Sequence, residues 1–201
     1  YVFAVLTVPA ILSVMLLILS QFSSDFIPKI CIEKNKVEFA LIAIITGLVG
    51  GGVLEETGWT GFATPIMIER FGPYRAGLVL GVIWGFWHFL PVFWASGDAS
   101  GMIDWALFLP GLFCHYVVLI PYRILIIRLY DHTLAFLPVM LMHASLTAFS
   151  SFILNIYAAG WPLFFYFLIL AAALWFIVAV VYKLDYREMT AIDRKNGSYG
   201  E

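Results

Sequence analysis

The sequence is poor in charged residues and in cysteine. Asp, Glu, Lys and Arg make up only 12% of its 201 residues, whereas a soluble domain carries about 25%. This scarcity excludes an ordinary water-soluble globule, and a net charge of −2 offers no basic surface for nucleic acid. The two cysteines, Cys31 and Cys114, have neither metal-site nor framework spacing, so we expect no disulfide between them.

Two common hydrolase motifs are also missing. No HExxH sequence occurs, which argues against the usual zinc protease arrangement, and no GxSxG sequence indicates a serine hydrolase. Glu and His side chains from several helices could still hold zinc, because catalytic zinc sites need only three protein ligands. That alternative stays open, although we expect neither a metal nor another cofactor.

Apolar residues dominate what is present, at 63% of the chain. A membrane-spanning helix needs about 20 consecutive, mostly apolar residues. The sequence therefore predicts an all-α, polytopic transmembrane helix bundle in a lipid bilayer, a multi-pass protein that we expect in the cell membrane. Six stretches qualify, namely Tyr1–Gln21, Val37–Ile68, Tyr74–Ala95, Met102–Leu129, Thr133–Tyr157 and Trp161–Lys183. We expect one transmembrane domain over residues 1–189 and a polar tail over residues 190–201.

Lys and Arg residues gather where the second, fourth and sixth stretches end, which places them at one face of the bundle, here called the basic face. The positive-inside rule predicts that this face is cytoplasmic, although Lys29, Lys34 and Lys36 lie at the other face. We interpret Arg123 and Arg128 as anchors whose charged ends reach the membrane surface.

Four ionisable residues lie deep within these apolar stretches. At about 1.5 Å per helical residue, Glu55, Glu56 and His88 lie roughly 20 Å from the basic face, and His143 lies roughly 15 Å from it. Such groups are costly in a bilayer and usually line a functional interior. Glu55 and Glu56 are about 100° apart on a helix, so we expect one to face a cavity and the other a partner.

Each of these groups has a polar or aromatic neighbour one helical turn away. Thr60 follows Glu56 by four residues and could contact its carboxylate, and Thr147 follows His143 by four and could share a target with the ring. Trp84 precedes His88 by four residues and could pack on the imidazole or line a cavity. We take Thr60, Trp84 and Thr147 as supporting residues.

These glutamates and histidines also have simpler, structural interpretations. The glutamate pair could cap a helix beside a bend at Gly50–Gly52, and a single buried histidine is more often a structural residue. His115, in "LFCHYVV", lies at a similar depth without a motif, and we expect it to make a structural hydrogen bond.

The segments "EETGWTGF", "WGFWH" and "HASLT" together resemble the three motifs of the CAAX-protease and bacteriocin-processing family of intramembrane glutamic endopeptidases. The family pattern is EExxxR, then FxxxH, then HxxxN, and the resemblance covers about residues 37–157. It implies a bundle of about eight membrane helices, so we expect one or two more upstream of Tyr1.

The resemblance implies roles for the four ionisable residues. Glu55 and His88 would activate a water, Glu56 matches the second motif glutamate, and His143 would stabilise the oxyanion. The implied activity is metal-independent cleavage of a peptide or protein substrate, with or without a lipid modification.

Three positions depart from the family pattern. Thr60 stands in place of Arg, Trp84 in place of Phe and Thr147 in place of Asn. The first change removes an i,i+4 cation partner for Glu56. A second function therefore stays open, in which a catalytically impaired scaffold, immunity protein or transporter binds a peptide or partner. A transporter would show paired broken helices, and only Gly50–Gly52 looks broken.

Overall fold

The computed structural model describes residues 1–98 and 100–197, and this part of the chain contains helices and no strand. The all-α prediction is therefore confirmed. In chain order the elements are α1 (Val2–Leu19), η1 (Ser24–Phe26), α2 (Lys29–Ile32), α3 (Lys36–Thr46), η2 (Gly47–Glu55), α4 (Glu56–Gly58), η3 (Trp59–Ala63), α5 (Thr64–Trp87), α6 (Phe89–Ala95), α7 (Trp105–Val117), α8 (Leu119–Thr133), α9 (Phe136–Ala148), η4 (Phe149–Ile153) and α10 (Gly160–Gly197).

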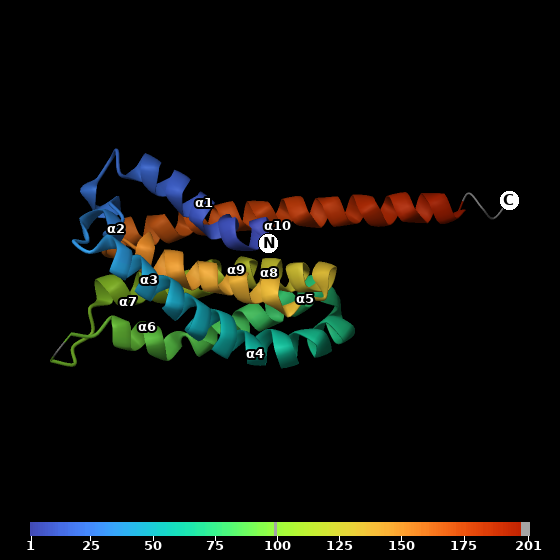
Figure 1. Ribbon diagram of the computed structural model, residues 1–201, viewed down its shortest axis with the longest axis horizontal. Coiled ribbons are helices and arrows are strands. Elements are labelled where there is room, and N and C mark those ends of the chain that lie inside the picture. Colours follow the sequence, from blue (N-terminus) through green and yellow to red (C-terminus); the bar gives the residue numbers. More distant parts are fainter. Residues whose placement is uncertain (99, 198–201) are drawn as a thin grey trace.

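The helices are long and apolar enough to form a membrane bundle. Five helical stretches could cross a bilayer by length and composition, and one of them, Lys36–Ala95, has 60 residues. Gly72 interrupts that stretch with φ 73°, a left-handed conformation that glycine adopts without steric cost. Two helices meet across a kink at this residue, and the chain turns back between the α4 and α5 labels in Figure 1, so this stretch can supply two of the six expected passes.

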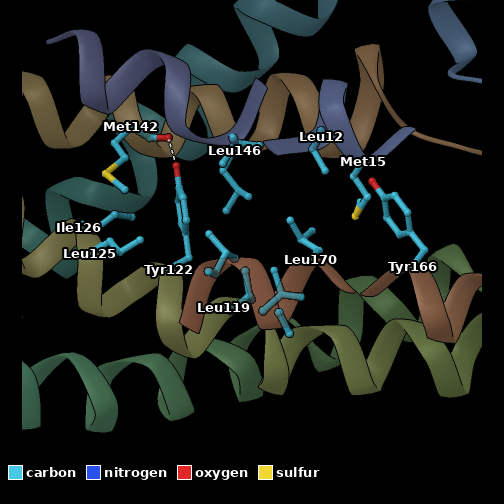
Figure 2. Packing of buried hydrophobic residues seen from close by; sticks show 14 of the residues in the cluster. Leu12, Met15, Leu119, Tyr122, Leu125, Ile126, Met142, Leu146, Tyr166 and Leu170 are labelled. Carbon is cyan, nitrogen blue, oxygen red and sulfur yellow. Dashed lines mark hydrogen bonds between the residues drawn. The ribbon is translucent and has the colours of Figure 1, made fainter. Parts of the chain in front are cut away.

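The core lies between α1, α8, α9 and α10 (Figure 2). Leu12, Met142 and Leu170 are almost fully buried there. The hydroxyl of Tyr122 on α8 donates to the carbonyl of Met142 on α9 at 2.6 Å, which satisfies a polar group inside the core. Many large apolar side chains lie outside instead, such as Trp87 and Phe176, as expected of a surface solvated by lipid.

Two rows of glycines bring helices together. Gly47, Gly51 and Gly52 of η2 pack against α9, and a Cβ on Gly51 would lie 2.5 Å from Thr147 Oγ1. In a second row, Gly77 and Gly81 let α5 pack against α8 in the same way, and Gly85 lets it pack against α7. Small residues allow close backbone approach between membrane helices.

The alternative in which the glutamates cap a helix beside a bend at Gly50–Gly52 is not supported. These residues lie within a continuous π-helix, η2, and two of the three make close interhelical contacts. The glycines do not break the helix but set its distance from α9.

Helix α10 is held at the basic face by an ion cluster. Arg128 of α8 pairs with Asp185 of α10 at 2.7 Å and also with Asp131, and the Tyr74 hydroxyl donates to Asp185. Arg128 thus reaches the basic face, as an anchor would, but its side chain is largely buried and paired there.

Beyond this cluster α10 continues past position 190, where the polar tail was expected to begin, to its last described residue, Gly197. The other residues of the expected tail, 198–201, lie outside the described part of the chain. Helix α10 has 38 residues, which corresponds to about 57 Å, and it extends beyond the other helices in Figure 1.

Candidate active site

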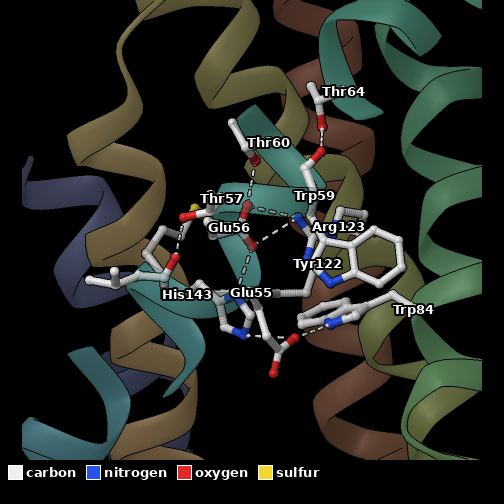
Figure 3. A network of polar contacts seen from close by, with 12 residues as sticks. Glu55, Glu56, Thr57, Trp59, Thr60, Thr64, Trp84, Tyr122, Arg123 and His143 are labelled. Carbon is white, nitrogen blue, oxygen red and sulfur yellow. Dashed lines mark hydrogen bonds and ion pairs between the residues drawn. The ribbon is translucent and has the colours of Figure 1, made fainter. Parts of the chain in front are cut away.

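The two adjacent glutamates lie at a junction between helix types. Glu55 ends the π-helix η2, and Glu56 begins the single turn of α4, which leads into a second π-helix, η3. π-Helical turns are rare and are often found at functional sites. The two carboxylates diverge from this junction, as their spacing predicted (Figure 3).

Glu56 lies at the centre of a buried polar network (Figure 3). Its side chain is fully buried, and its Oε1 accepts a hydrogen bond from His143 Nδ1 at 2.7 Å. Arg123 Nη1 lies 2.9 Å from Oε1 and 3.1 Å from Oε2. The Thr60 hydroxyl donates to Oε2, which is the contact expected from its i,i+4 position. Protein groups therefore enclose this carboxylate.

Arg123 does not reach the membrane surface, so its interpretation as an anchor is wrong. Its side chain is 0% exposed, and its guanidinium carbon lies 4.1 Å from the ring centroid of Trp84 and 5.8 Å from that of Trp59. Among the described residues, Nε and Nη2 have no hydrogen-bond partner. The aromatic faces beside them provide cation–π stabilisation instead.

Glu55 lies in a more open position. Its side chain is 25% exposed, and its Oε2 accepts a hydrogen bond from Trp84 Nε1 at 2.9 Å. His88 Nε2 lies 4.0 Å from Glu55 Oε1, and His143 Nε2 lies 3.9 Å from Oε2. One carboxylate thus faces two imidazoles that come from other helices.

Trp84 contacts Glu55 and both histidines. Its ring makes edge-on contacts with His88 and His143, at centroid distances of 5.3 Å and 5.0 Å. Packing on an imidazole was expected from the sequence, whereas the hydrogen bond to Glu55 was not.

Hydrogen bonds indicate which nitrogen of each histidine carries a proton. His88 Nδ1 lies 2.8 Å from the Trp84 carbonyl oxygen, which can only accept, so Nδ1 is the donor. His143 Nδ1 likewise faces the Glu56 carboxylate. Both Nε2 atoms then point toward Glu55, and in a neutral imidazole each is a hydrogen-bond acceptor.

A cavity of about 520 Å³ begins at these histidines. Its lining includes Trp84, His88, His143 and Thr147, and it extends between helices to the face of the bundle opposite the basic face. There it reaches Lys29, Ser96, Ser151 and Asn155. Thr147 thus borders the cavity as a neighbour of His143, but its hydroxyl makes no hydrogen bond within the described part of the chain.

His115 lies closer to the site than the sequence indicated. Its Nδ1 donates to the Gly111 carbonyl at 2.7 Å, so the expected structural hydrogen bond is confirmed. Its ring also stacks on His88 at 5.1 Å and lines the cavity.

Sequence reasoning missed the placement of Arg123, although a signal was available. Arg123 precedes the chain reversal at Thr133 by about ten residues, and His143 follows it by about ten. The depth estimate that placed His143 therefore also places Arg123 at the same level.

No arrangement suited to a metal ion is found around these residues. Within residues 1–98 and 100–197, no group of three or more His, Cys, Asp and Glu side chains could hold one. Cys31 and Cys114 are both free thiols, as expected.

Comparison with known proteins connects this geometry to a family. The family model described as "Type II CAAX prenyl endopeptidase Rce1-like" matches residues 37–149, more than half of the chain. The chain belongs to this Rce1-like family. The matched region includes both glutamates, His88, His143 and Arg123. By its description, the Rce1-like family is one of CAAX-protease-type endopeptidases.

A curated relative agrees with this assignment over a shorter region. CAAX prenyl protease 2 of Methanococcus maripaludis is 32% identical over 73 residues, which is 36% of this chain and 21% of the relative. The match thus spans about a fifth of that relative's own length. No solved structure matches the chain.

Proposed function

We propose that this Rce1-like protein is an intramembrane glutamic endopeptidase in which Glu55 and His88 activate the hydrolytic water. The observation that carries the proposal is the placement of one partly exposed carboxylate, Glu55, about 4 Å from the Nε2 atoms of His88 and His143, two histidines that line a cavity. Family membership supports peptide hydrolysis, and the geometry supports the roles of the residues.

Water activation follows from the acceptors that face one another. Glu55 Oε1 and His88 Nε2 are 4.0 Å apart, too far for a direct hydrogen bond but close enough for one water to donate to both. A carboxylate and a neutral imidazole can each accept a proton from that water as a general base. The resulting hydroxide attacks the carbonyl of the scissile bond, and the proton taken from the water passes to the leaving amine as the C–N bond breaks.

Glu56 has a different role in this scheme. Both of its oxygens are occupied by Arg123, His143 and Thr60, and the side chain is fully buried. It is therefore a poor candidate for the base and a good one for orienting His143. A carboxylate that accepts from Nδ1 fixes both the tautomer and the ring position, as in catalytic triads.

His143 is the proposed oxyanion-stabilising group. To donate from Nε2 while Nδ1 donates to Glu56, its ring must carry both protons, and the Glu56 carboxylate stabilises that imidazolium. Preorganised donors of this kind commonly contribute about 3–4 kcal/mol to transition-state stabilisation.

The cavity indicates an extended peptide as the substrate. One side carries the hydroxyl and amide groups of Thr147, Ser150, Ser151 and Asn155, and the other side is apolar, with Leu163, Phe167 and Leu170 from α10. The polar side can bond a peptide backbone while the apolar side receives side chains or a lipid. Prenylated peptides are the first substrates to test, because the family is named for prenyl endopeptidases.

The decisive experiment compares the purified wild-type protein with Glu55→Gln on a fluorescence-quenched prenylated peptide, and on membrane peptides monitored by mass spectrometry. We expect the wild type to cleave and Glu55→Gln to lose cleavage while still inserting and folding. Equal turnover by the two proteins would exclude Glu55 as the base. Peptide binding by both without cleavage by either would instead support the scaffold alternative.

A further inference from the structure

We infer that Arg123 is the positioning residue of this site, supplying from α8 the positive charge that keeps Glu56 and His143 in place. The inference deepens the proposed function and rests on it. Glu56 is a fully buried carboxylate. A buried charge without a partner is strongly destabilising, so Glu56 requires a cation beside it.

Within the described part of the chain, Arg123 is the cationic side chain of Lys or Arg type in contact with Glu56. Position 60, four residues after Glu56, could hold a cation on the same helix face but carries a neutral threonine. The Thr60 hydroxyl does reach Glu56, so a side chain at this position points at the carboxylate. The charge therefore comes from a separate helix.

Arg123 also contacts the other half of the site. Its guanidinium lies 4.1 Å from the ring centroid of Trp84, and the same indole donates to Glu55 and packs on both histidines. Arg123 thus holds Glu56 through an ion pair and Trp84 through a cation–π contact. Loss of the guanidinium would loosen both carboxylates relative to His143.

Arg123 itself is placed away from the substrate. Its side chain is 0% exposed, whereas that of Glu55 is 25% exposed. It acts through Glu56, which fixes the Nδ1 proton of His143 and so directs Nε2 toward Glu55. A defect here should therefore appear in turnover rather than in substrate binding.

The test moves the charge from one helix to the other. We expect Arg123→Leu to lower kcat roughly 100-fold, as misplaced catalytic groups do, with KM changed less than about threefold. Adding Thr60→Arg to that variant should raise kcat again by at least about tenfold, because a side chain at position 60 reaches the same carboxylate. Arg128→Leu is the matched control, since Arg128 lies on the same helix and pairs with Asp131 and Asp185; its kcat should stay within about twofold of the wild type.

Two results would overturn the inference. One is a folded Arg123→Leu protein with wild-type kcat, and the other is a folded Thr60→Arg/Arg123→Leu protein that is no more active than Arg123→Leu. If Arg123→Leu does not fold, the test rests on the Thr60→Arg/Arg123→Leu variant. Recovery of folded, active protein in this variant would support the inference, and its absence would refute it.

A second measurement separates this inference from the proposed function. Thermal unfolding of Glu56→Gln, Arg123→Leu and the combined variant needs no cleavage assay. We expect the two losses in Tm to be clearly non-additive, because the residues form one buried pair. A wild type without peptidase activity but with this coupling would refute the proposed function and leave the pairing intact, whereas additive losses would refute the pairing.

Discussion

Two neighbouring residues of the same type have opposite surroundings in this site. Glu55 is partly exposed, with Trp84 as its hydrogen-bond donor, and Glu56 is fully enclosed by Arg123, His143 and Thr60. The difference follows from their angular separation of about 100° on the helix, which turns Glu55 toward the Nε2 atoms of two histidines and Glu56 toward Arg123 of α8. Chemically identical substitutions should therefore have different consequences.

We predict that Glu55→Gln and Glu56→Gln differ in stability as well as in activity. Glu55→Gln should reduce cleavage by about 10²–10⁴-fold, the usual contribution of a general base, and leave Tm unchanged because the amide oxygen can still accept from Trp84. Glu56→Gln should destabilise the protein by about 3–5 kcal/mol, since it leaves Arg123 buried without its counter-charge.

Activity assays and thermal unfolding of the purified variants in one detergent would check both parts. Thr57→Ser is a suitable control, because the Thr57 hydroxyl bonds the carbonyl of Val53 and takes no part in the network. Equal Tm losses for the two glutamine variants would contradict the different surroundings described here.

The sequence predicted the depth of these residues but only part of their environment. Counting residues from the basic face placed Glu55, Glu56, His88 and His143 at a common level, and the structure brings them together. The role of Arg123 as a partner was missed because a charged residue near a helix end is usually a surface anchor. Whether Arg123 is an anchor or a partner depends on the contact between α8 and Glu56 of α4, and sequence periodicity does not encode that contact.

At the level of helices, the contact between η2 and α9 sets the distance between the glutamates and His143. A Cβ on Gly51 would lie 2.5 Å from Thr147 Oγ1 and 2.9 Å from His143 Cδ2, whereas a Cβ on the adjacent Gly50 would meet nothing within 4 Å. Hydropathy alone could predict a membrane helix here. It could not predict the π-helical form or the close approach, which depend on the neighbouring helix.

We predict that Gly51→Ala and Gly50→Ala have clearly different effects. The methyl group of Gly51→Ala overlaps α9, so the helices must separate at a cost of about 1–3 kcal/mol, and turnover should fall at least about tenfold as His143 moves. Gly50→Ala, in the same helix, should keep wild-type turnover and Tm.

The pair of variants is its own control, because both replace glycine by alanine one position apart in η2. Matching kcat and Tm values for the two would show that the close contact with α9 does not position the site.

For the whole molecule, the membrane passes were predictable from hydropathy, because a helix that crosses a bilayer must be mostly apolar over about 20 residues. The arrangement of those passes required structure, since α1, α8, α9 and α10 share one core although they are far apart in sequence. The proposed catalytic site belongs to this scale too, because its residues come from η2, α4, the junction of α5 and α6, and α9.

We predict that the intact enzyme works without a metal ion. Treatment with EDTA or 1,10-phenanthroline, followed by removal of the chelator, should leave kcat within about twofold, because the proposed water activation uses only Glu55 and His88. Metal content of the purified protein, measured by mass spectrometry, provides the accompanying readout. Activity that is lost on chelation and recovered with zinc would favour the zinc alternative.

The position of the cavity determines from which aqueous compartment a substrate can enter. The cavity ends near Lys29 and Asn155, at the face opposite the basic face. The positive-inside rule then predicts that this end lies outside the cytoplasm. Cys31, an exposed free thiol two residues from Lys29, reports on it directly, and Cys114 is less exposed.

An impermeant maleimide should therefore label the protein in intact cells, and Cys31→Ser should not be labelled. Labelling only after permeabilisation would place the entrance in the cytoplasm. For one insertion topology, the cavity can receive either exported substrates or substrates anchored on the inner leaflet, but not both. The labelling of Cys31 therefore decides whether candidate substrates are sought among secreted or among intracellular peptides.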